Sequence, residues 1–234
     1  MRLPRRLEPE WLDQLPADDP WANRAQRDLG RINACMQNAG SMASALMKYG
    51  ACREPCKIVD LGSGDGRFML RVAGRVAPHW PDIKIILQDK KDIVSQATRE
   101  GFAALQWQVQ TSSEDVFDFL AGSRSSSADV ITSNLFLHHF TDEELTRLLA
   151  KVAQIAGLFV ACEPRRSKFV VRASRLLWII GCNERSIHDA KVSARAGFRD
   201  RELSSLWPDK RRWELHENVT GLFTHCFVAR RAEC

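Results

Sequence analysis

Apolar residues along the chain recur in two different periods, and the two periods alternate after an N-terminal region. Residues 21–49 place apolar side chains such as Leu29, Ile32 and Met36 at helical spacing, with Gly40 as the expected break. Beyond this region, short apolar runs of strand length alternate with longer amphipathic segments. This alternation predicts a mostly parallel sheet with helices on both faces.

The predicted elements follow one another in a regular order. Strands are expected at Cys56–Leu61, Ile83–Leu87, Ala104–Val109, Asp129–Ser133 and Gly157–Cys162. Helices are expected at Arg67–Val76, Asp92–Glu100, Asp115–Leu120, Asp142–Ala156, Phe169–Ile180 and His188–Ala196. Two further alternating segments, Trp213–Thr220 and Thr224–Ala229, predict a hairpin. We therefore expect an α/β fold: a doubly wound, mostly parallel seven-stranded sheet with a C-terminal antiparallel hairpin and an N-terminal helical lid. Residues 1–50 would form the lid, which caps the substrate, and residues 51–234 the sheet domain, in one compact unit.

Composition and charge narrow the class of protein. A chain of 234 residues with 44% hydrophobic and 27% charged residues has the size and composition of one globular domain. The net charge of +5 is mild and its basic residues are spread along the chain, so nucleic acid is not the expected partner. No apolar run is long enough to span a membrane, and the charged N-terminal residues do not form a signal peptide. We expect a cytoplasmic protein, and the sequence does not fix its oligomeric state.

The cysteines do not form a metal-binding pattern. The seven cysteines are odd in number and scattered, and the pair Cys52 and Cys56 has no second pair at metal-site spacing. Histidines at the regular intervals of a metal site are also missing. The prediction is therefore reduced thiols and no bound metal.

The sharpest local signal is a glycine-rich loop between the first predicted strand and the helix that follows. Residues 59–66 read Val-Asp-Leu-Gly-Ser-Gly-Asp-Gly, with glycine at alternate positions. The dinucleotide fingerprint G-x-G-x-x-G is not met, because Arg67 occupies its third glycine position. Asp60 and Asp65 would repel a pyrophosphate but suit a cofactor with a cationic amino group and a sulfonium. The pattern therefore favours S-adenosyl-L-methionine (SAM) over a dinucleotide.

A second acidic residue stands one strand later. Asp89 follows the second predicted strand, where a carboxylate accepts hydrogen bonds from ribose hydroxyls in this topology. The alternative is a charged turn, since the local sequence is Asp-Lys-Lys-Asp. The glycine loop one strand earlier favours the ribose role.

Together these features resemble the class I, Rossmann-like SAM-dependent methyltransferases. The motif Asp60-x-Gly62-x-Gly64-x-Gly66 matches the cofactor loop of that family, and Asp89 matches its acidic ribose position. Residues 113–116 resemble the segment beside adenine, with Asp115, or else Glu114, as the contact. The resemblance implies SAM as cofactor, held by Asp60, Gly62, Ser63, Gly64, Gly66, Asp89, Lys90, Asp115, Val116, Ser133 and Arg31.

The segment after the fourth predicted strand resembles the part of small-molecule members that lines the methyl-transfer site. Residues 133–140 read Ser-Asn-Leu-Phe-Leu-His-His-Phe, and they lack the Asn/Asp-Pro-Pro-Tyr tetrad of many nucleic-acid and protein-amide methyltransferases. His138, His139 and His188 are the candidates for a general base, because a histidine accepts protons near neutral pH. Neighbouring residues seldom face the same way, so we expect at most one of the adjacent pair to point into the site, with His139 preferred.

The expected substrate is a small apolar or aromatic metabolite. Residues 169–182 mix aliphatic residues and a tryptophan with arginines, which suits a helix along an apolar pocket or one in peripheral contact with a membrane. Oxygen is favoured as the methyl acceptor, with nitrogen and carbon open. Arg24, Arg27 and Arg31 could pair with the SAM carboxylate or an acidic substrate. The alternatives are an RNA-modifying methyltransferase and a catalytically silent partner protein of the same fold.

Overall fold

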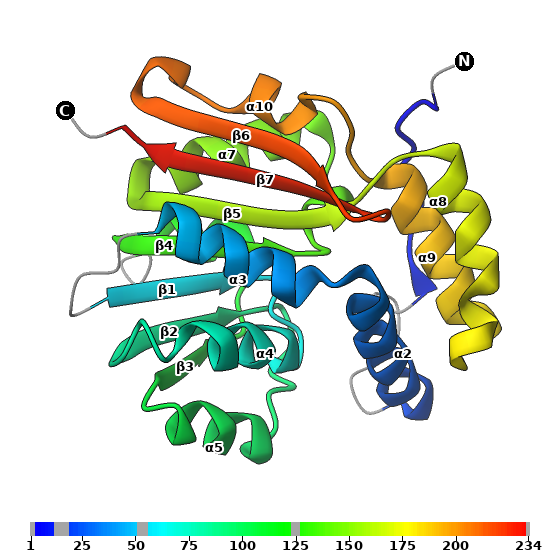
Figure 1. Cartoon of the computed structure of the whole chain (residues 1–234), viewed down its shortest axis with the longest axis horizontal. Coiled ribbons are helices and arrows are strands. Elements are labelled where there is room, and N and C mark those ends of the chain that lie inside the picture. Colours follow the sequence, from blue (N-terminus) through cyan, green and yellow to red (C-terminus); the bar gives the residue numbers. More distant parts are fainter. Residues whose placement is uncertain (1–2, 12–18, 51–55, 123–126, 233–234) are drawn as a thin grey trace.

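A single mixed sheet organises the molecule. The computed structural model describes residues 3–11, 19–50, 56–122 and 127–232. The sheet has seven strands in the order β3-β2-β1-β4-β5-β7-β6 (Figure 1). The strands are β1 (Cys56–Leu61), β2 (Ile83–Gln88), β3 (Gln108–Ser112), β4 (Ala128–Asn134), β5 (Ala156–Pro164), β6 (Trp213–Thr220) and β7 (Thr224–Arg231). The first five strands are parallel, while β7 pairs antiparallel with both β5 and β6. The predicted doubly wound sheet with an antiparallel hairpin is therefore confirmed.

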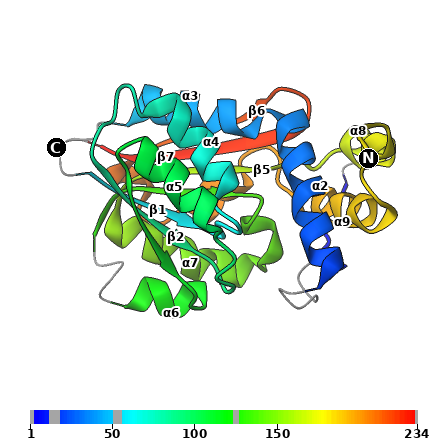
Figure 2. The same cartoon turned by 90° about the horizontal axis from the view of Figure 1, so that it is seen from below.

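Helices cover both faces of this sheet. Along the chain they are α2 (Pro20–Met36), α3 (Asn38–Tyr49), α4 (Arg67–Val76), α5 (Gln96–Ala104), α6 (Val116–Ala121), α7 (Asp142–Ile155), α8 (Lys168–Ala173), α9 (Glu184–Ala196) and α10 (Glu202–Leu206), with 3-10 turns η2 (Leu137–His139), η3 (Ser174–Ile180) and η4 (Lys210–Arg212). Figure 2 shows α3, α4 and α5 on one face and α6 and α7 on the other.

Each face buries its own apolar cluster. One cluster joins Leu46 of α3 and Val72 of α4 to Ile85 of β2. The other joins Leu148 of α7 to Phe159 of β5. Strands β1 and β5 lie between the two clusters and are buried along nearly their whole length, which explains their continuous apolar runs.

Several predicted boundaries are wrong. The N-terminal helical region breaks at Gln37, whose φ of 57° ends α2, so that Gly40 lies inside α3. The third strand begins at Gln108 and not at Ala104, because the helix before it starts late: Ser95 caps α5 through the backbone N–H of Thr98. The predicted helix over 169–180 is also shorter than expected, since it gives way at Ser174 to the 3-10 turn η3.

The cysteines also depart from expectation. Cys56 is disulfide-bonded, which contradicts the prediction that all seven thiols are reduced. The remaining described cysteines, Cys35, Cys162, Cys182 and Cys226, are free, and Cys52 and Cys234 lie outside the described residues. In the part of the chain that the structure describes, no helix has the length and apolar character needed to cross a membrane.

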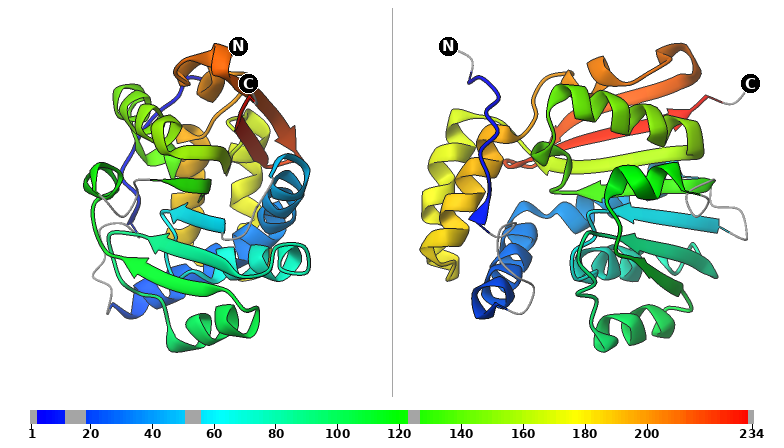
Figure 3. Two further views of the ribbon diagram at one scale, coloured as in Figure 1. Left: turned by 90° about the vertical axis from the view of Figure 1, so that its left-hand side faces the viewer. Right: turned by 180° about the vertical axis from the view of Figure 1, so that it is seen from behind.

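One end of the sheet carries a cap built from three parts of the chain. Figure 3 shows α2, α8 and α9 grouped at the end toward which β5 runs, with the N-terminal segment passing beside them. Asp28 of α2 is fully buried and accepts hydrogen bonds from the backbone N–H of Asn183 (3.0 Å) and the hydroxyl of Ser186 (2.9 Å) at the start of α9. Arg5 fixes the N-terminal segment through the carbonyls of Ala196 and Phe140, each at 2.8 Å.

Candidate active site

A large cavity lies where the parallel strands meet the cap. Its volume is about 1370 Å³, whereas a typical small-molecule pocket occupies about 300–1,000 Å³. The glycine loop, the segment after β4, α2 and the α8–α9 region all contribute to its wall. The cavity is therefore large enough for two ligands side by side.

The glycine loop after β1 has a backbone that requires glycine. Gly62, Gly64 and Gly66 have φ angles of 68°, 55° and 74°, in the left-handed region that other residues rarely adopt. A Cβ on Gly62 would lie 2.3 Å from the ring of Phe136. The loop is held from the next strand as well, because the carboxylate of Asp89 accepts a hydrogen bond from the backbone N–H of Gly64 at 2.9 Å. Together these contacts fix a tight backbone turn on the cavity wall.

Asp60 supplies a buried carboxyl group at the base of this loop. It is 2% exposed, and the hydroxyl of Thr132 on β4 donates a hydrogen bond to it at 2.7 Å. Burial and the neighbouring Asp89 raise the pKa of Asp60 to about 7, although the Thr132 hydrogen bond works in the opposite direction. Asp60 is therefore close to half ionised at neutral pH, and a cation bound in the cavity would favour its charged form.

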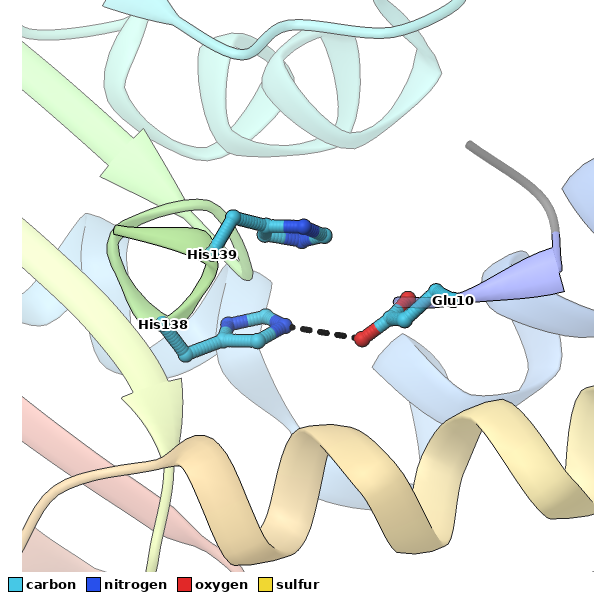
Figure 4. A group of neighbouring side chains, drawn as sticks. All are labelled: Glu10, His138 and His139. Atoms are coloured by element: carbon cyan, nitrogen blue, oxygen red, sulfur yellow. Dashed lines mark hydrogen bonds and ion pairs between the residues drawn. The ribbon is translucent and has the colours of Figure 1, made fainter. Parts of the chain in front are cut away.

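The segment after β4 holds a histidine between two carboxylates. His138 is 3% exposed, with Nδ1 2.7 Å from Glu163 and Nε2 3.2 Å from Glu10 (Figure 4). The other oxygen of Glu163 accepts the backbone N–H groups of Phe136 and Leu137, at 3.0 and 2.8 Å. Burial disfavours charge on His138, but the hydrogen bonds to Glu10 and Glu163 outweigh burial and raise the pKa of His138 to about 9. His138 is therefore protonated at neutral pH.

Glu10 reaches this position from the N-terminal segment. Burial disfavours its charged form, but hydrogen bonds from His138 and from the hydroxyl of Ser193 on α9 lower the pKa of Glu10 to about 2. The side chain is 12% exposed and lines the cavity. Glu10 thus ties the N-terminal segment to both the sheet and the cap.

His139 lies beside His138 on the same side of the chain. Their ring centroids are 4.2 Å apart, and both rings point toward Glu10 (Figure 4). The expectation that at most one of the pair faces the site is wrong, because the 3-10 turn η2 places the two rings side by side, tilted by 38°, and both residues line the cavity. His139 is the more exposed of the two.

Most of the predicted cofactor residues meet at this cavity. Its wall includes Asp60, Gly62, Ser63, Gly64, Asp89, Lys90, Val116 and Arg31. Arg31 is already engaged, since its guanidinium donates hydrogen bonds to Asp28 (2.7 Å) and to the carbonyl of Gly181 (2.9 Å).

Four predicted site residues are not among those that line the cavity. Gly66 precedes α4, where a Cβ would meet Leu87 at 2.8 Å. Asp115 caps α6 through the backbone N–H of Phe117 and lies 3.0 Å from the ammonium of Lys90. Ser133 is fully buried in β4. His188 is exposed on α9, edge-on to the ring of Trp11 with centroids 6.2 Å apart.

Sequence reasoning missed Glu10 and Glu163. Glu163 had a usable signal, because it ends the fifth strand at the same edge as the glycine loop. Glu10 had none, since it lies 128 residues before His138 in a segment without periodic pattern.

Another part of the cavity wall is apolar. It comes from α8, η3 and the turn between β6 and β7: Val170, Ala173, Leu176, Leu177, Ile180 and Phe223. Several apolar side chains of η3 are also exposed, including Leu176, which is 57% exposed, and Trp178, which is 64% exposed. A ligand that covered Leu176 would bury apolar surface that water now contacts.

The sequence and the fold were compared with those of known proteins. Residues 58–156 match a family model described as a methyltransferase domain. The fold is similar to that of the mitomycin 7-O-methyltransferase (TM-score 0.60, 19% identity, 94% of this chain covered) and of an O-methyltransferase family protein from Burkholderia thailandensis (0.57, 17%, 92%). The chain spans only 60% and 63% of the lengths of those two proteins.

A third similar structure has nearly the same length. The plantazolicin methyltransferase, solved in complex with a triazolic desmethylPZN analogue and S-adenosylhomocysteine (SAH), has a TM-score of 0.63 and 11% identity, with 94% of this chain and 92% of that chain covered. Among curated proteins, no sequence relative matches the chain.

Proposed function

We propose that this chain is a class I, Rossmann-like SAM-dependent methyltransferase that transfers the methyl group to an oxygen atom of a small apolar or aromatic metabolite. One observation carries the proposal: a single cavity of about 1370 Å³ joins the glycine loop to the apolar wall of α8 and η3, with both histidines of η2 on its surface. The polar part suits SAM, and the remaining volume suits an apolar acceptor.

The residues of the cofactor part have distinct roles in this proposal. The glycine loop brings its backbone close to SAM, and Asp89, which orders that loop, receives the ribose hydroxyls. Asp60 balances the positive charge of the cofactor from below the loop. Val116 lies beside the adenine, and Arg31 lies beside the amino-acid end of SAM.

The reaction itself is an in-line displacement. The acceptor oxygen forms a bond to the methyl carbon while the carbon–sulfur bond breaks, and the sulfonium of SAM becomes the neutral thioether of SAH. The hydroxyl proton must leave, and a free phenol has a pKa of about 10. In this proposal His139 accepts the proton, because its imidazole lines the cavity. The apolar wall limits water around the reacting atoms.

The test is methyl transfer from isotopically labelled SAM to a matched panel of acceptors. We expect label in apolar phenols and hydroxylated ring compounds, and much less in their amino analogues or in charged acceptors of equal size. Label that enters only the amines would contradict oxygen specificity. Label that enters only RNA, with binding that weakens steeply with salt, would favour the RNA-modifying alternative.

Two variants test whether His139 is the residue that assists proton loss. His139→Ala should lower turnover on the accepted substrate by roughly 100-fold or more, the usual contribution of assisted proton transfer. His188→Ala is the matched control, since it removes an exposed imidazole that does not line the cavity. A loss in the His188 variant with full turnover in the His139 variant would transfer the role to His188.

A further inference from the structure

The histidines of η2 and Glu10 bring three ligand atoms of metal-binding type together. One atom each from Glu10, His138 and His139 lie within 4.8 Å of one another. The closest pair, Nε2 of His138 and a carboxylate oxygen of Glu10, is 3.2 Å apart. Two ligands about 2.0–2.2 Å from a tetrahedral metal ion are about 3.3–3.6 Å apart, so this pair is nearly at the required separation.

A second carboxylate orients the central histidine as metal sites require. Glu163 is fully buried and contacts Nδ1 of His138 at 2.7 Å, while two backbone N–H groups hold its other oxygen. A carboxylate on one ring nitrogen keeps the proton there and turns the other nitrogen toward the metal. In this structure that other nitrogen points at Glu10 (Figure 4).

The position between these three residues is accessible from the cavity and leaves one ligand position open, as catalytic metal centres do. All three residues line the cavity, so a fourth ligand can enter from the side where a substrate would bind. Two histidines and one carboxylate with an open position is a recurrent donor set for divalent first-row transition metals. Glu10 and Glu163 also supply two negative charges close to the ion.

We propose that Glu10, His138 and His139 bind one divalent first-row transition-metal ion, with Glu163 as a positioning residue, and that the ion takes the acceptor oxygen of the substrate as its open ligand. The ion takes the place of the hydrogen bond between His138 and Glu10, whose proton is released to solvent. The sequence spacing predicted no metal site because the ligands come from segments 128 residues apart.

The ion gives the proposed methyl transfer a route to an anionic nucleophile. A divalent ion lowers the pKa of a bound hydroxyl, whose proton leaves to water, and the oxygen then attacks the methyl carbon of SAM. His139 supports deprotonation as a ligand in this scheme. This step rests on the function proposed above, whereas metal binding itself does not.

The test uses Co²⁺ as a spectroscopic probe. The full-length protein, freed of any affinity tag and treated with a chelator, is titrated with Co²⁺, and the visible absorption of the bound ion is followed. We expect one equivalent to bind with bands typical of nitrogen and oxygen ligands, and Zn²⁺ to displace it. Glu10→Gln and His139→Ala should each weaken binding at least about tenfold, and Glu163→Gln by about 10- to 100-fold, as outer ligands commonly do.

Two controls separate the possible failures. His188→Ala removes an exposed histidine outside the cavity wall and should leave the Co²⁺ titration unchanged. Calorimetric titration of every variant with SAH reports whether the fold and cofactor site are intact. Absence of bound Co²⁺ in protein that binds SAH would overturn the metal site and leave the proposed function standing. Co²⁺ binding that survives both Glu10→Gln and His139→Ala would also overturn the metal site. Co²⁺ binding by a protein that does not bind SAH would support the metal site and contradict the proposed function.

Discussion

The two ends of the cavity are built in opposite ways. The proposed cofactor end comes from strand ends that are neighbours in the sheet, and its shape depends on local backbone: a turn with three glycines at positive φ and one aspartate from the next strand. The proposed substrate end comes from the N-terminal segment and the α8–α9 region, which side-chain contacts join to each other and to α2. Ligand binding at the locally determined end should therefore be most sensitive to changes that strain the backbone. Binding at the assembled end should be sensitive to the loss of single side chains.

The largest effect on SAH affinity is expected in the glycine loop, whose backbone conformation requires glycine. Gly62→Ala places a Cβ against the ring of Phe136 on a residue with φ of 68°, and such strain alone costs about 1–3 kcal/mol. We expect SAH affinity to fall by at least about tenfold, measured by calorimetry.

The matched control for that variant is another glycine of the same region. Gly74 lies inside α4, where an added Cβ meets no atom within 4 Å. Gly74→Ala should leave SAH affinity unchanged and stabilise the protein by about 0.5–1 kcal/mol. Equal SAH affinity in both variants would contradict the role of the loop.

An intermediate effect should follow from the charge of Asp60. Because the folded pKa is raised to about 7, Asp60 keeps its proton in the folded chain over a range in which the unfolded chain releases it. Stability from this group is therefore present at low pH and is lost as pH rises from about 4 to about 7. SAH, with its cationic amino group, should bind more tightly at pH 8 than at pH 6.

Asp60→Asn separates these two consequences. We expect the variant to have a higher Tm than the wild type at pH 8 without ligand, and an SAH affinity that no longer rises between pH 6 and 8. The uncharged amide keeps the shape of the carboxyl group, so the variant changes the charge alone. Scanning calorimetry measures the Tm and ligand titration measures the SAH affinity on the same samples. A pH-dependent SAH affinity that persists in Asp60→Asn would assign the titration to another group.

The smallest effect is expected at the apolar wall. Leu176→Ser changes a cavity-lining residue that is 57% exposed, and Leu222→Ser changes a residue of the turn before β7 that is 59% exposed and does not line the cavity. Both should alter stability by less than about 0.5 kcal/mol. Only the Leu176 variant should raise the KM of an apolar acceptor, by a few-fold, and leave SAH affinity unchanged. A similar KM in both variants would contradict the position of the acceptor.

The same contrast explains what could be predicted from sequence. Asp60, the glycines and Asp89 were found because a strand, a tight turn and a helix follow one another within a few residues, and parallel strands bring their carboxyl ends to one edge. The succession of strands and helices along the chain followed from the same periodicity. The break at Gln37 was missed because glutamine carries no strong turn signal, and the third strand was displaced because Ser95 caps its preceding helix late.

The substrate end could not be predicted for a physical reason. Glu10 reaches His138 only because Arg5 fixes the N-terminal segment to carbonyls at the end of α9 and after η2. These contacts join residues far apart in sequence, and no local pattern encodes them. The joint orientation of His138 and His139 likewise depends on the 3-10 turn, which has no periodic signature in a run of three residues.

The most direct test of this division is a calorimetric titration with SAH of the wild type, Asp89→Ala and Glu10→Gln. The account predicts one SAH per wild-type chain. Asp89→Ala should weaken binding by at least about tenfold, because a charged hydrogen-bonding group contributes roughly 1.5–3 kcal/mol. Glu10→Gln should bind SAH as the wild type does. No binding by the folded wild type, or equal losses in the two variants, would contradict a cofactor end that forms independently of the substrate end.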